Sequence, residues 1–93
     1  MEGFEWDAAK AEANLGKHGV SFTAAARLFD DTYRIEWVDT RYEYQEERFV
    51  SVGQVNAELV SVAYTMRGEV IRIISARRAS KREREEYYGN RSL

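Results

Sequence analysis

The chain has 93 residues, of which 44% are hydrophobic and 13% are aromatic, and it contains no cysteine. A chain this short closes a single hydrophobic core, so its length excludes two domains, and the lack of cysteine excludes disulfides and thiolate zinc sites. The 14 basic and 16 acidic side chains give a net charge of -2, which by itself argues against a nucleic-acid partner because phosphate binding depends mainly on Lys and Arg.

The charges are distributed unevenly along the chain. Residues 1–63 carry 6 basic and 12 acidic side chains, a net charge of -6, whereas residues 64–93 carry 8 basic and 4 acidic ones, a net charge of +4. This asymmetry predicts two surfaces that meet two kinds of partner. The alternative is that the basic segment is a solvated helix whose charges form ion pairs four residues apart.

Membrane and secretion signals are not expected. The longest apolar stretches are a few residues, against the ~20 that a membrane-spanning helix needs, and the first residues, MEGFEWD, lack the basic and apolar regions of a signal peptide. We therefore expect a cytoplasmic protein with no membrane partner.

Two helices are predicted in the first third of the chain. Asp7 can accept hydrogen bonds from the first turn of a helix in which apolar residues recur at helical spacing, until Gly19 offers a left-handed stop. Ser21 can cap a second helix, which has a narrow apolar stripe and ends at two consecutive aspartates. We predict helices at about 7–18 and 22–30.

The pattern then changes to short runs of β-branched and aromatic residues, which predict strands at 33–39, 48–55, 59–66 and 70–76. Short separators with turn-forming residues, Asn56-Ala57 and Arg67-Gly68, predict antiparallel hairpins between the last three strands. The longer polar link between the first two strands is expected to be exposed. A third helix at 79–88, with Ser80 as its cap, closes a domain of the α+β class.

Side chains alternate between the two faces of a sheet, so both faces can be assigned if the hairpin loops contain an even number of residues. One face, expected to pack against the two helices as the core, then holds Phe49, Val60, Val62, Tyr64, Ile71 and Ile73. The other face is smaller and more polar, and it holds Arg48, Val50, Val52, Ser61, Ala63, Thr65, Val70, Arg72, Ile74 and Ala76.

Two arginines on the second face are candidate site residues. Arg72 lies in a hydrophobic strand, where a guanidinium loses hydration unless it is paired or held for a ligand, and its planar fork suits phosphate. Arg48 is expected on the same face, two strands away, close enough for both to bind one anion. The alternatives are a salt-bridged structural role for Arg72 and an ion pair of Arg48 with Glu46 or Glu47.

Further cations lie near the predicted ends of elements. Arg77 and Arg78 follow the last strand at a junction where backbone N–H groups and guanidiniums can converge on a phosphate, although pairing with glutamates of the third helix is an equal alternative. Lys17 and the only histidine, His18, end the first helix. Histidine suits proton transfer because it changes charge near neutral pH, but at a helix C-terminus it also contacts the helix dipole favourably.

The sequence gives little support for a metal site, a cofactor site or base stacking. One histidine and no cysteine leave only carboxylates as metal ligands, and these show neither the spacing of a calcium loop nor that of a paired hydrolase site, so we expect no metal and no other cofactor. Phe4, Trp6, Trp37 and the tyrosines are able to stack on bases, but the favoured interpretation places them in the core.

Several short motifs occur together in this chain: Phe4-Glu-Trp-Asp7, Asn-Leu-Gly-Lys-His-Gly-Val at 14–20, Phe22 with Ala25 and Phe29-Asp30, Glu47-Arg48, Tyr64 with Arg67-Gly68, and Arg-Ile-Ile-Ser-Ala-Arg at 72–77. With these motifs the chain resembles the BrnT family from about residue 4 to Tyr88. The resemblance implies a RelE-like α+β fold with two N-terminal helices, an antiparallel sheet of about four strands and a C-terminal helix. It places one domain at 4–88 and a short tail at 89–93. Ala8 departs from the family, in which Pro often stands there, and this affects the helix start rather than the chemistry.

The resemblance also implies the function: an endoribonuclease toxin that inhibits translation and is neutralised by a cognate antitoxin of the BrnA type, which carries a DNA-binding region. Its substrate would be mRNA, free or on the ribosome. The matching motif positions make Lys17, His18, Arg48, Arg72 and Arg77 the catalytic candidates. The expected RNA-binding residues are Arg67, Arg78 and Lys81.

A mechanism consistent with these side chains needs no metal. The ribose 2′-hydroxyl attacks the adjacent phosphate, which requires RNA because DNA lacks that hydroxyl. Arg72 and Arg48 would stabilise the developing charge, His18 or Lys17 would transfer protons, and Glu47 is a reserve base. The antitoxin is expected to cover the basic site. The rival interpretation is a non-catalytic RNA- or protein-binding module, such as an inactive toxin relative that acts in complex with an antitoxin.

Overall fold

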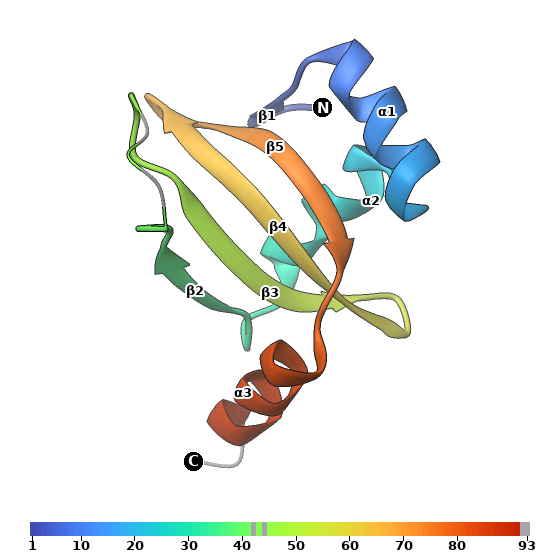
Figure 1. Cartoon of the computed structure of the whole chain (residues 1–93), viewed down its shortest axis with the longest axis vertical. Helices are drawn as coiled ribbons and strands as arrows, with labels where there is room; N and C mark the ends of the chain where they lie inside the picture. Colours follow the sequence, from blue (N-terminus) through green and yellow to red (C-terminus); the bar gives the residue numbers. More distant parts are fainter. Residues whose placement is uncertain (42, 44, 92–93) are drawn as a thin grey trace.

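A five-stranded sheet forms the centre of the structure, a computed structural model that describes residues 1–41, 43 and 45–91. Along these residues the elements are β1 Phe4–Glu5, α1 Ala8–His18, α2 Phe22–Ala26, the 3-10 helix η1 Arg27–Asp30, β2 Ile35–Val38, β3 Phe49–Val55, β4 Glu58–Arg67, β5 Val70–Arg78 and α3 Lys81–Arg91. The strand order across the sheet is β1-β5-β4-β3-β2. In Figure 1, α1 lies beside β5, α2 passes behind the sheet, and α3 lies beyond the end of β5. The predicted α+β class is confirmed.

The predicted helix boundaries are set by the expected caps. The Asp7 carboxylate accepts a hydrogen bond from the backbone N–H of Lys10 at 3.0 Å, which lowers the pKa of Asp7, and Gly19 ends α1 in the left-handed region with φ 70°. The hydroxyl of Ser21 accepts from the N–H of Ala24 at 3.0 Å. The second predicted helix is confirmed in position, but its second half tightens into the 3-10 turn η1.

Both hairpin loops contain two residues, which confirms the assumption on which the two sheet faces were assigned. Val55 pairs with Glu58 in the β3–β4 ladder, and Arg67 pairs with Val70 in the β4–β5 ladder. The first loop residue is in the left-handed region in each case, Asn56 with φ 55° and Gly68 with φ 62°. These residues tolerate that conformation better than β-branched ones, so the turn chemistry and the register agree.

β1 was missed by the sequence analysis. It has only two residues and pairs in parallel with β5, Phe4 with Ile71 and Glu5 with Arg72, so the sheet is mixed and has five strands rather than about four antiparallel ones. A strand this short carries no periodic pattern of its own, and its partner lies 67 residues away along the chain.

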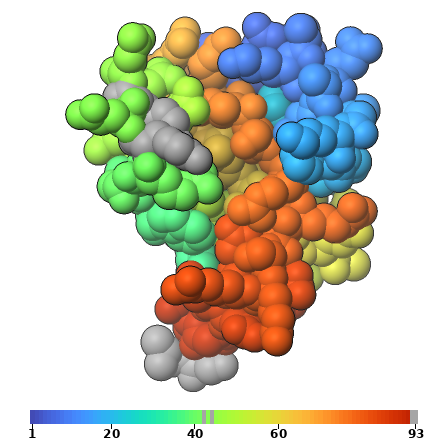
Figure 2. All heavy atoms as spheres, in the orientation of Figure 1, coloured from blue at the N-terminus to red at the C-terminus, as the bar shows by residue number. Residues whose placement is uncertain are grey.

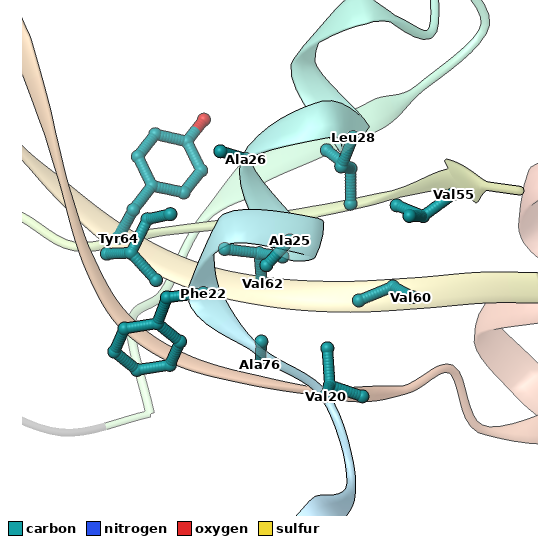
Figure 3. Packing of buried hydrophobic residues seen from close by; sticks show 11 residues of the cluster. Val20, Phe22, Ala25, Ala26, Leu28, Val55, Val60, Val62, Tyr64 and Ala76 are labelled. Atoms are coloured by element: carbon teal, nitrogen blue, oxygen red, sulfur yellow. The ribbon is translucent and has the colours of Figure 1, made fainter. Parts of the chain in front are cut away.

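The main core lies between the sheet and the first helices, on the face that the sequence predicted. Figure 3 shows Phe22 and Ala25 of α2 packed over Val62 of β4. Phe22 is 2% exposed, and Ala25 and Val62 are fully buried. Aromatic edges add to this packing, because the ring of Phe29 meets that of Tyr64 at 5.0 Å in a T-shaped arrangement. Burial raises the pKa of Tyr64 to about 12.

The opposite face of the sheet packs against α3 at one end. Tyr87, 1% exposed, forms a second buried cluster with Val52, Leu59 and Ala79. Its hydroxyl donates to Asp31 Oδ2 at 2.6 Å, and burial together with this carboxylate raises the pKa of Tyr87 to about 12. This contact fixes the direction of α3 relative to the sheet.

α3 is longer than predicted. The sequence analysis ended the third helix near Tyr88, whereas α3 continues to Arg91, and the last two residues of the expected tail lie outside the described residues. The guanidinium of Arg91 lies 4.7 Å from the ring centre of Tyr33, a cation–π contact that holds the last turn against the segment before β2.

α1 is attached to the edge of β5 by one buried side chain. The Asn14 amide accepts a hydrogen bond from the N–H of Ala76 at 3.1 Å and donates to the carbonyl of Ala76 at 2.8 Å and to that of Val20 at 3.0 Å. Ala76 is fully buried and Asn14 is 8% exposed. Since β1 covers only the start of β5, the amide takes the place of a neighbouring strand further along it.

Candidate active site

A hollow of about 600 Å³ opens on the face of the sheet opposite the main core. Its floor and walls come from four strands, from α3 and from the segments that follow β2 and β5. We call the lining residues the groove residues: Trp37, Arg41, Val50, Ser61, Ala63, Ser75, Arg77, Ser80, Arg82, Glu83 and Glu86. Figure 2 shows the surface hollowed over β4, between the green residues of β2 and β3 and the orange residues of β5, above α3. The middle of the groove is lined by small or hydroxyl side chains, so the floor is low and polar.

A β-bulge decides which residues of β5 face the groove. Tyr64 pairs with Ile73 and Ala63 pairs with Ser75, so Ile74 is an extra residue in β5 and the alternation changes phase there. The sequence analysis placed Ala76 on the second face, and this was wrong, because Ala76 is buried in the main core. Ser75 and Arg77 point into the groove instead.

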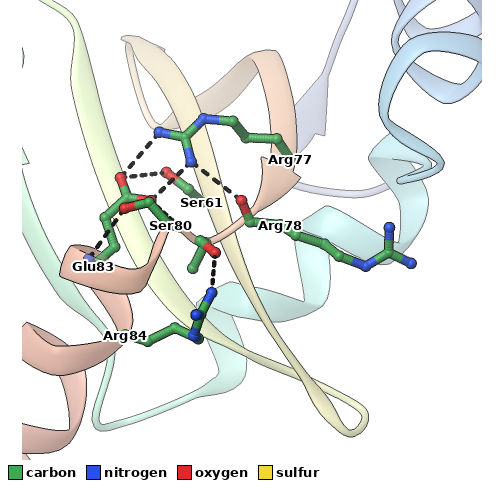
Figure 4. A network of polar contacts seen from close by, with 7 residues as sticks. Ser61, Arg77, Arg78, Ser80, Glu83 and Arg84 are labelled. Atoms are coloured by element: carbon green, nitrogen blue, oxygen red, sulfur yellow. Dashed lines mark hydrogen bonds and ion pairs between the residues drawn. The ribbon is translucent and has the colours of Figure 1, made fainter.

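Arg77 is held in the groove by a carboxylate of α3. Its guanidinium makes a bidentate contact with Glu83, Nη1 to Oε1 at 2.8 Å and Nη2 to Oε2 at 3.1 Å, and Nη1 also donates to the carbonyl of Arg78 at 3.2 Å (Figure 4). The hydroxyl of Ser61 lies 3.3 Å from Glu83 Oε2. The alternative in which Arg77 pairs with a helix-three glutamate is therefore realised, and the pairing orients the guanidinium beside the groove floor.

Glu83 is also the N-cap partner of α3. It accepts the N–H of Ser80 at 2.8 Å while its own N–H donates to the hydroxyl of Ser80 at 3.2 Å, which is a capping box. Burial works to raise the pKa of Glu83, but the hydrogen bonds from Arg77 and Ser80 outweigh it and lower that pKa. One ionised carboxylate thus starts the helix and fixes the arginine.

Arg72 lies on the groove side of the sheet, further along β5. It pairs with Thr65 in the β4–β5 ladder, two residues beyond Ala63 on the same face. Its guanidinium contacts the Glu5 carboxylate at 2.5 Å, with 27% of the Arg72 side chain and 37% of the Glu5 side chain exposed. Arg72 is thus partly open to solvent and paired with the Glu5 carboxylate of β1, and its charge also helps to lower the pKa of Asp7.

Arg48 comes immediately before β3. Its carbonyl accepts the N–H of Asp39 at 2.8 Å, which continues the β2–β3 ladder by one residue, so alternation from Val50 places the Arg48 side chain on the groove face. The hydroxyl of Thr65 donates to the carbonyl of Glu47 at 2.7 Å, which brings the Arg48 segment level with the Thr65–Arg72 pair. Arg48 and Arg72 therefore share one face, as the sequence predicted, beyond the groove residues.

Lys17 and His18 are separate from this groove. They form the last turn of α1, where Lys17 is exposed and His18 is half-buried, and neither is a groove residue. A Cβ at the neighbouring Gly19 would lie 4.0 Å from an Nη atom of Arg78, so Arg78 extends toward α1, as Figure 4 shows. The structure brings Arg48, Arg72 and Arg77 to one face but does not bring Lys17 and His18 to the groove.

The three expected RNA-binding residues are exposed but dispersed. Arg78 pairs with Glu58 at 3.0 Å, with 62% of its side chain exposed. Arg67 ends β4 at the far hairpin, and Lys81 begins α3 with its amine 3.9 Å from the Glu85 carboxylate. These pairs are surface contacts of small energetic weight, so the cations remain accessible to a polyanion.

Sequence reasoning missed two features of the groove. It favoured a core position for Trp37, which is 38% exposed and lines the groove. It named the glutamates of the third helix as alternative partners of Arg77 but did not single out Glu83, although Ser80 and Glu83 have the spacing of a capping box, a signal that would have placed this carboxylate beside the end of β5. Two other expected aromatic residues, Tyr42 and Tyr44, lie outside the described residues.

Within residues 1–41, 43 and 45–91, no three His, Asp or Glu side chains are grouped so that they could hold a metal ion. In the same residues no helix has the length and apolar character needed to cross a bilayer.

Comparison with known proteins identifies the family. A search of curated proteins found no match. The family model described as ribonuclease toxin, BrnT, of type II toxin-antitoxin system matches residues 6–83, most of the chain, and confirms the resemblance drawn from the sequence motifs. The chain therefore belongs to the BrnT family, the ribonuclease toxins of type II toxin–antitoxin systems.

Proposed function

We propose that the groove and the adjoining Arg48–Arg72 face form the active site of an endoribonuclease that cleaves RNA without a metal ion. The observation that carries this proposal is the position of Arg77, whose guanidinium is held by the partly buried carboxylate of Glu83 beside a low floor of serine and alanine side chains. The contacts with Glu83 and the Arg78 carbonyl use three of the five N–H donors of Arg77, so two N–H groups remain for a phosphate. The fixed position of the guanidinium means that little reorganisation accompanies the reaction.

The proposed reaction is an attack of the ribose 2′-hydroxyl on the adjacent phosphate. The 2′-hydroxyl gives its proton to a base as its oxygen bonds to phosphorus. The bond from phosphorus to the 5′-oxygen of the next nucleotide breaks, and that oxygen takes up a proton, which gives a 2′,3′-cyclic phosphate and a free 5′-hydroxyl. Arg77 and Arg72 would stabilise the charge that develops on the phosphate oxygens, and Arg48 would add to the same field from β3. Lys17 and His18 take second place as proton-transfer residues because they lie outside the groove residues.

As a type II ribonuclease toxin the protein acts on RNA and has an antitoxin partner. We propose further that cleavage of mRNA, free or on the ribosome, inhibits translation in the cytoplasm, and that the partner is of the BrnA type with a DNA-binding region. An antitoxin that covers the groove would meet Arg41, Arg77 and Arg82, so acidic side chains are expected on its contacting segment.

The test is whether the purified protein cleaves a defined single-stranded RNA in a buffer that contains a metal chelator. Wild type is expected to cut, and Arg72→Ala and Arg77→Ala are each expected to lose at least ~100-fold in kcat/KM, which corresponds to about 2.7 kcal/mol of transition-state stabilisation. His18→Ala tests the second-place assignment in the same assay.

Arg27→Ala is the matched control, because Arg27 is an exposed arginine of η1, on the opposite side of the sheet, and its loss changes the net charge equally. Circular dichroism of every variant checks that the fold is kept. Equal losses in Arg27→Ala and Arg77→Ala would contradict the proposed site, since they would indicate a general charge effect.

A second candidate function is favoured by one observation. Arg72, Arg77 and Arg78 each contact a carboxylate, as expected if the arginines were structural in a non-catalytic relative that only binds its antitoxin. Induction of the toxin alone separates the two functions: growth arrest that Arg72→Ala abolishes supports the enzyme, whereas a harmless protein without RNA cleavage in the assay above supports the binding module.

A further inference from the structure

Trp37 is an exposed aromatic side chain on a concave surface lined by three arginines and two glutamates. Trp37 is 38% exposed on β2 and lines the groove, whereas the other tryptophan, Trp6, packs edge-on against Phe22 with ring centres 6.0 Å apart. Exposing an indole to water is unfavourable, and Trp is enriched among the residues that anchor binding partners. Core packing therefore does not account for Trp37.

The register of the sheet places Trp37 and Arg77 at opposite sides of the groove floor. One row of paired residues crosses four strands, from Trp37 through Val50 and Ala63 to Ser75. Arg77 stands in the next row, opposite Ser61. Three strand spacings separate Trp37 from Ser75, on the order of 14 Å between backbones, and the side chains of both walls shorten that gap. Between the walls the small side chains of Ala63 and Ser75 leave room for a sugar or a base.

The walls and rim carry the chemistry that recognises single-stranded nucleic acid. Arg41, with 69% of its side chain exposed, lies beyond Trp37 and contacts Asp39. Arg82, with 90% of its side chain exposed, lies on the α3 side, 3.9 Å from the carboxylate of Glu86, a surface contact that leaves the guanidinium accessible. Unpaired bases stack on aromatic rings while guanidiniums bind the backbone, and a duplex does not present its bases in this way. The neighbouring Val38 is exposed too, but alternation directs it away from the groove, so Trp37 is not the centre of a wide apolar patch of the kind that a protein partner needs.

We propose that Trp37 forms a base-stacking subsite for single-stranded RNA, in which a base close to the phosphate held by Arg77 lies on the indole. This inference rests on the proposed function, because it takes the groove to be the RNA site. The subsite would bind any base by its flat face and would set the direction of the strand across β4, with the scissile phosphate at the β5 wall and the stacked base at the β2 wall.

The test measures binding of a fluorescent RNA of about eight nucleotides whose 2′-positions are methylated, so that it binds without being cut. Trp37→Ala is expected to weaken binding by on the order of 10- to 100-fold, Trp37→Phe to restore most of the affinity, and Val38→Ala to bind as wild type. A second probe is the same strand with abasic nucleotides. Its binding is expected to be equal in wild type and Trp37→Ala, because only the phosphate backbone remains for the protein to bind.

The outcomes separate this inference from the proposed function. If Arg77→Ala loses cleavage while Trp37→Ala binds the methylated RNA as wild type, the subsite is overturned and the active site stands. If Trp37→Ala keeps its RNA affinity but fails to bind the co-expressed antitoxin, Trp37 belongs to a protein interface and the inference is overturned. If wild type neither binds nor cleaves RNA, both proposals fail. The expected result is that Trp37→Ala loses affinity for the strand that carries bases but not for the abasic strand, and that Trp37→Phe restores most of this affinity.

Discussion

The buried amide of Asn14 provides a direct test of how α1 is held on the sheet. Asn14→Ala removes one acceptor and two donors, and it leaves the N–H and carbonyl of Ala76 and the carbonyl of Val20 without these partners. A buried polar group without a partner costs about 1–3 kcal/mol, the three costs are not additive, and Ala gains a few tenths of a kcal/mol over Asn in a helix. We therefore expect a loss of about 3 kcal/mol, a large part of the total stability of a small domain.

The measurement is urea unfolding followed by circular dichroism, with thermal unfolding in parallel. A loss of about 3 kcal/mol corresponds to a decrease of roughly 12–24 °C in Tm for a domain of this size. Asn14→Asp keeps the side-chain volume and the acceptor but turns both donor contacts into repulsion between oxygens, so it should destabilise the fold at least as much at neutral pH. Glu12→Ala, an exposed change on the same helix, should stay within ±0.5 kcal/mol. A loss below about 1 kcal/mol in Asn14→Ala would refute the reasoning.

Two further predictions concern glycines and pH. A Cβ at Gly53 would lie 3.0 Å from Leu28 Cγ and 3.1 Å from Arg34 Cβ, so Gly53→Ala should lower the unfolding free energy by about 1–3 kcal/mol. Gly16→Ala, in the open interior of α1, should raise it by about 0.5–1 kcal/mol in the same denaturation assay. A Gly53→Ala variant as stable as wild type would show that the contacts around Gly53 are not this close. Because the pKa values of Glu83 and Asp31 are lowered in the fold, their contribution to stability is complete above the ordinary carboxylate values of 4.5 and 3.8 and is lost as the pH falls through the folded values. Glu83→Gln keeps an acceptor for the cap of α3 but removes the charge beside Arg77. Between about pH 7 and pH 3, the unfolding free energy of this variant should therefore decrease less steeply with falling pH than that of wild type. Equal slopes in variant and wild type would show that Glu83 is not the titrating group.

Much of the fold was predictable because its signals are local. Asp7 and Ser21 cap helices by accepting hydrogen bonds from residues three positions later, and Gly19 ends α1 by a conformation that its own lack of a side chain permits. The period-two alternation of β3 and β4 and their two-residue loop fixed which side chains face the helices. The motifs that point to the BrnT family lie in these same local segments, and the match over residues 6–83 confirms them.

The candidate site depended on contacts between residues far apart in the sequence. The bulge at Ile74 turns Arg77 rather than Ala76 to the groove, and it arises from how β5 fits β4, which the sequence of β5 alone does not reveal. Glu5 reaches Arg72 only because β1 pairs in parallel with β5.

The division between sequence and tertiary structure has a physical cause. Caps, turns and side-chain periodicity are decided by interactions within a few residues, so the sequence alone determined the helices, the hairpins, the core face and the family. The partner of each charge and the exposure of Trp37 depend on which strands and helices become neighbours after folding. Only the tertiary structure decided that Glu83 anchors Arg77 and that an indole faces it across the groove.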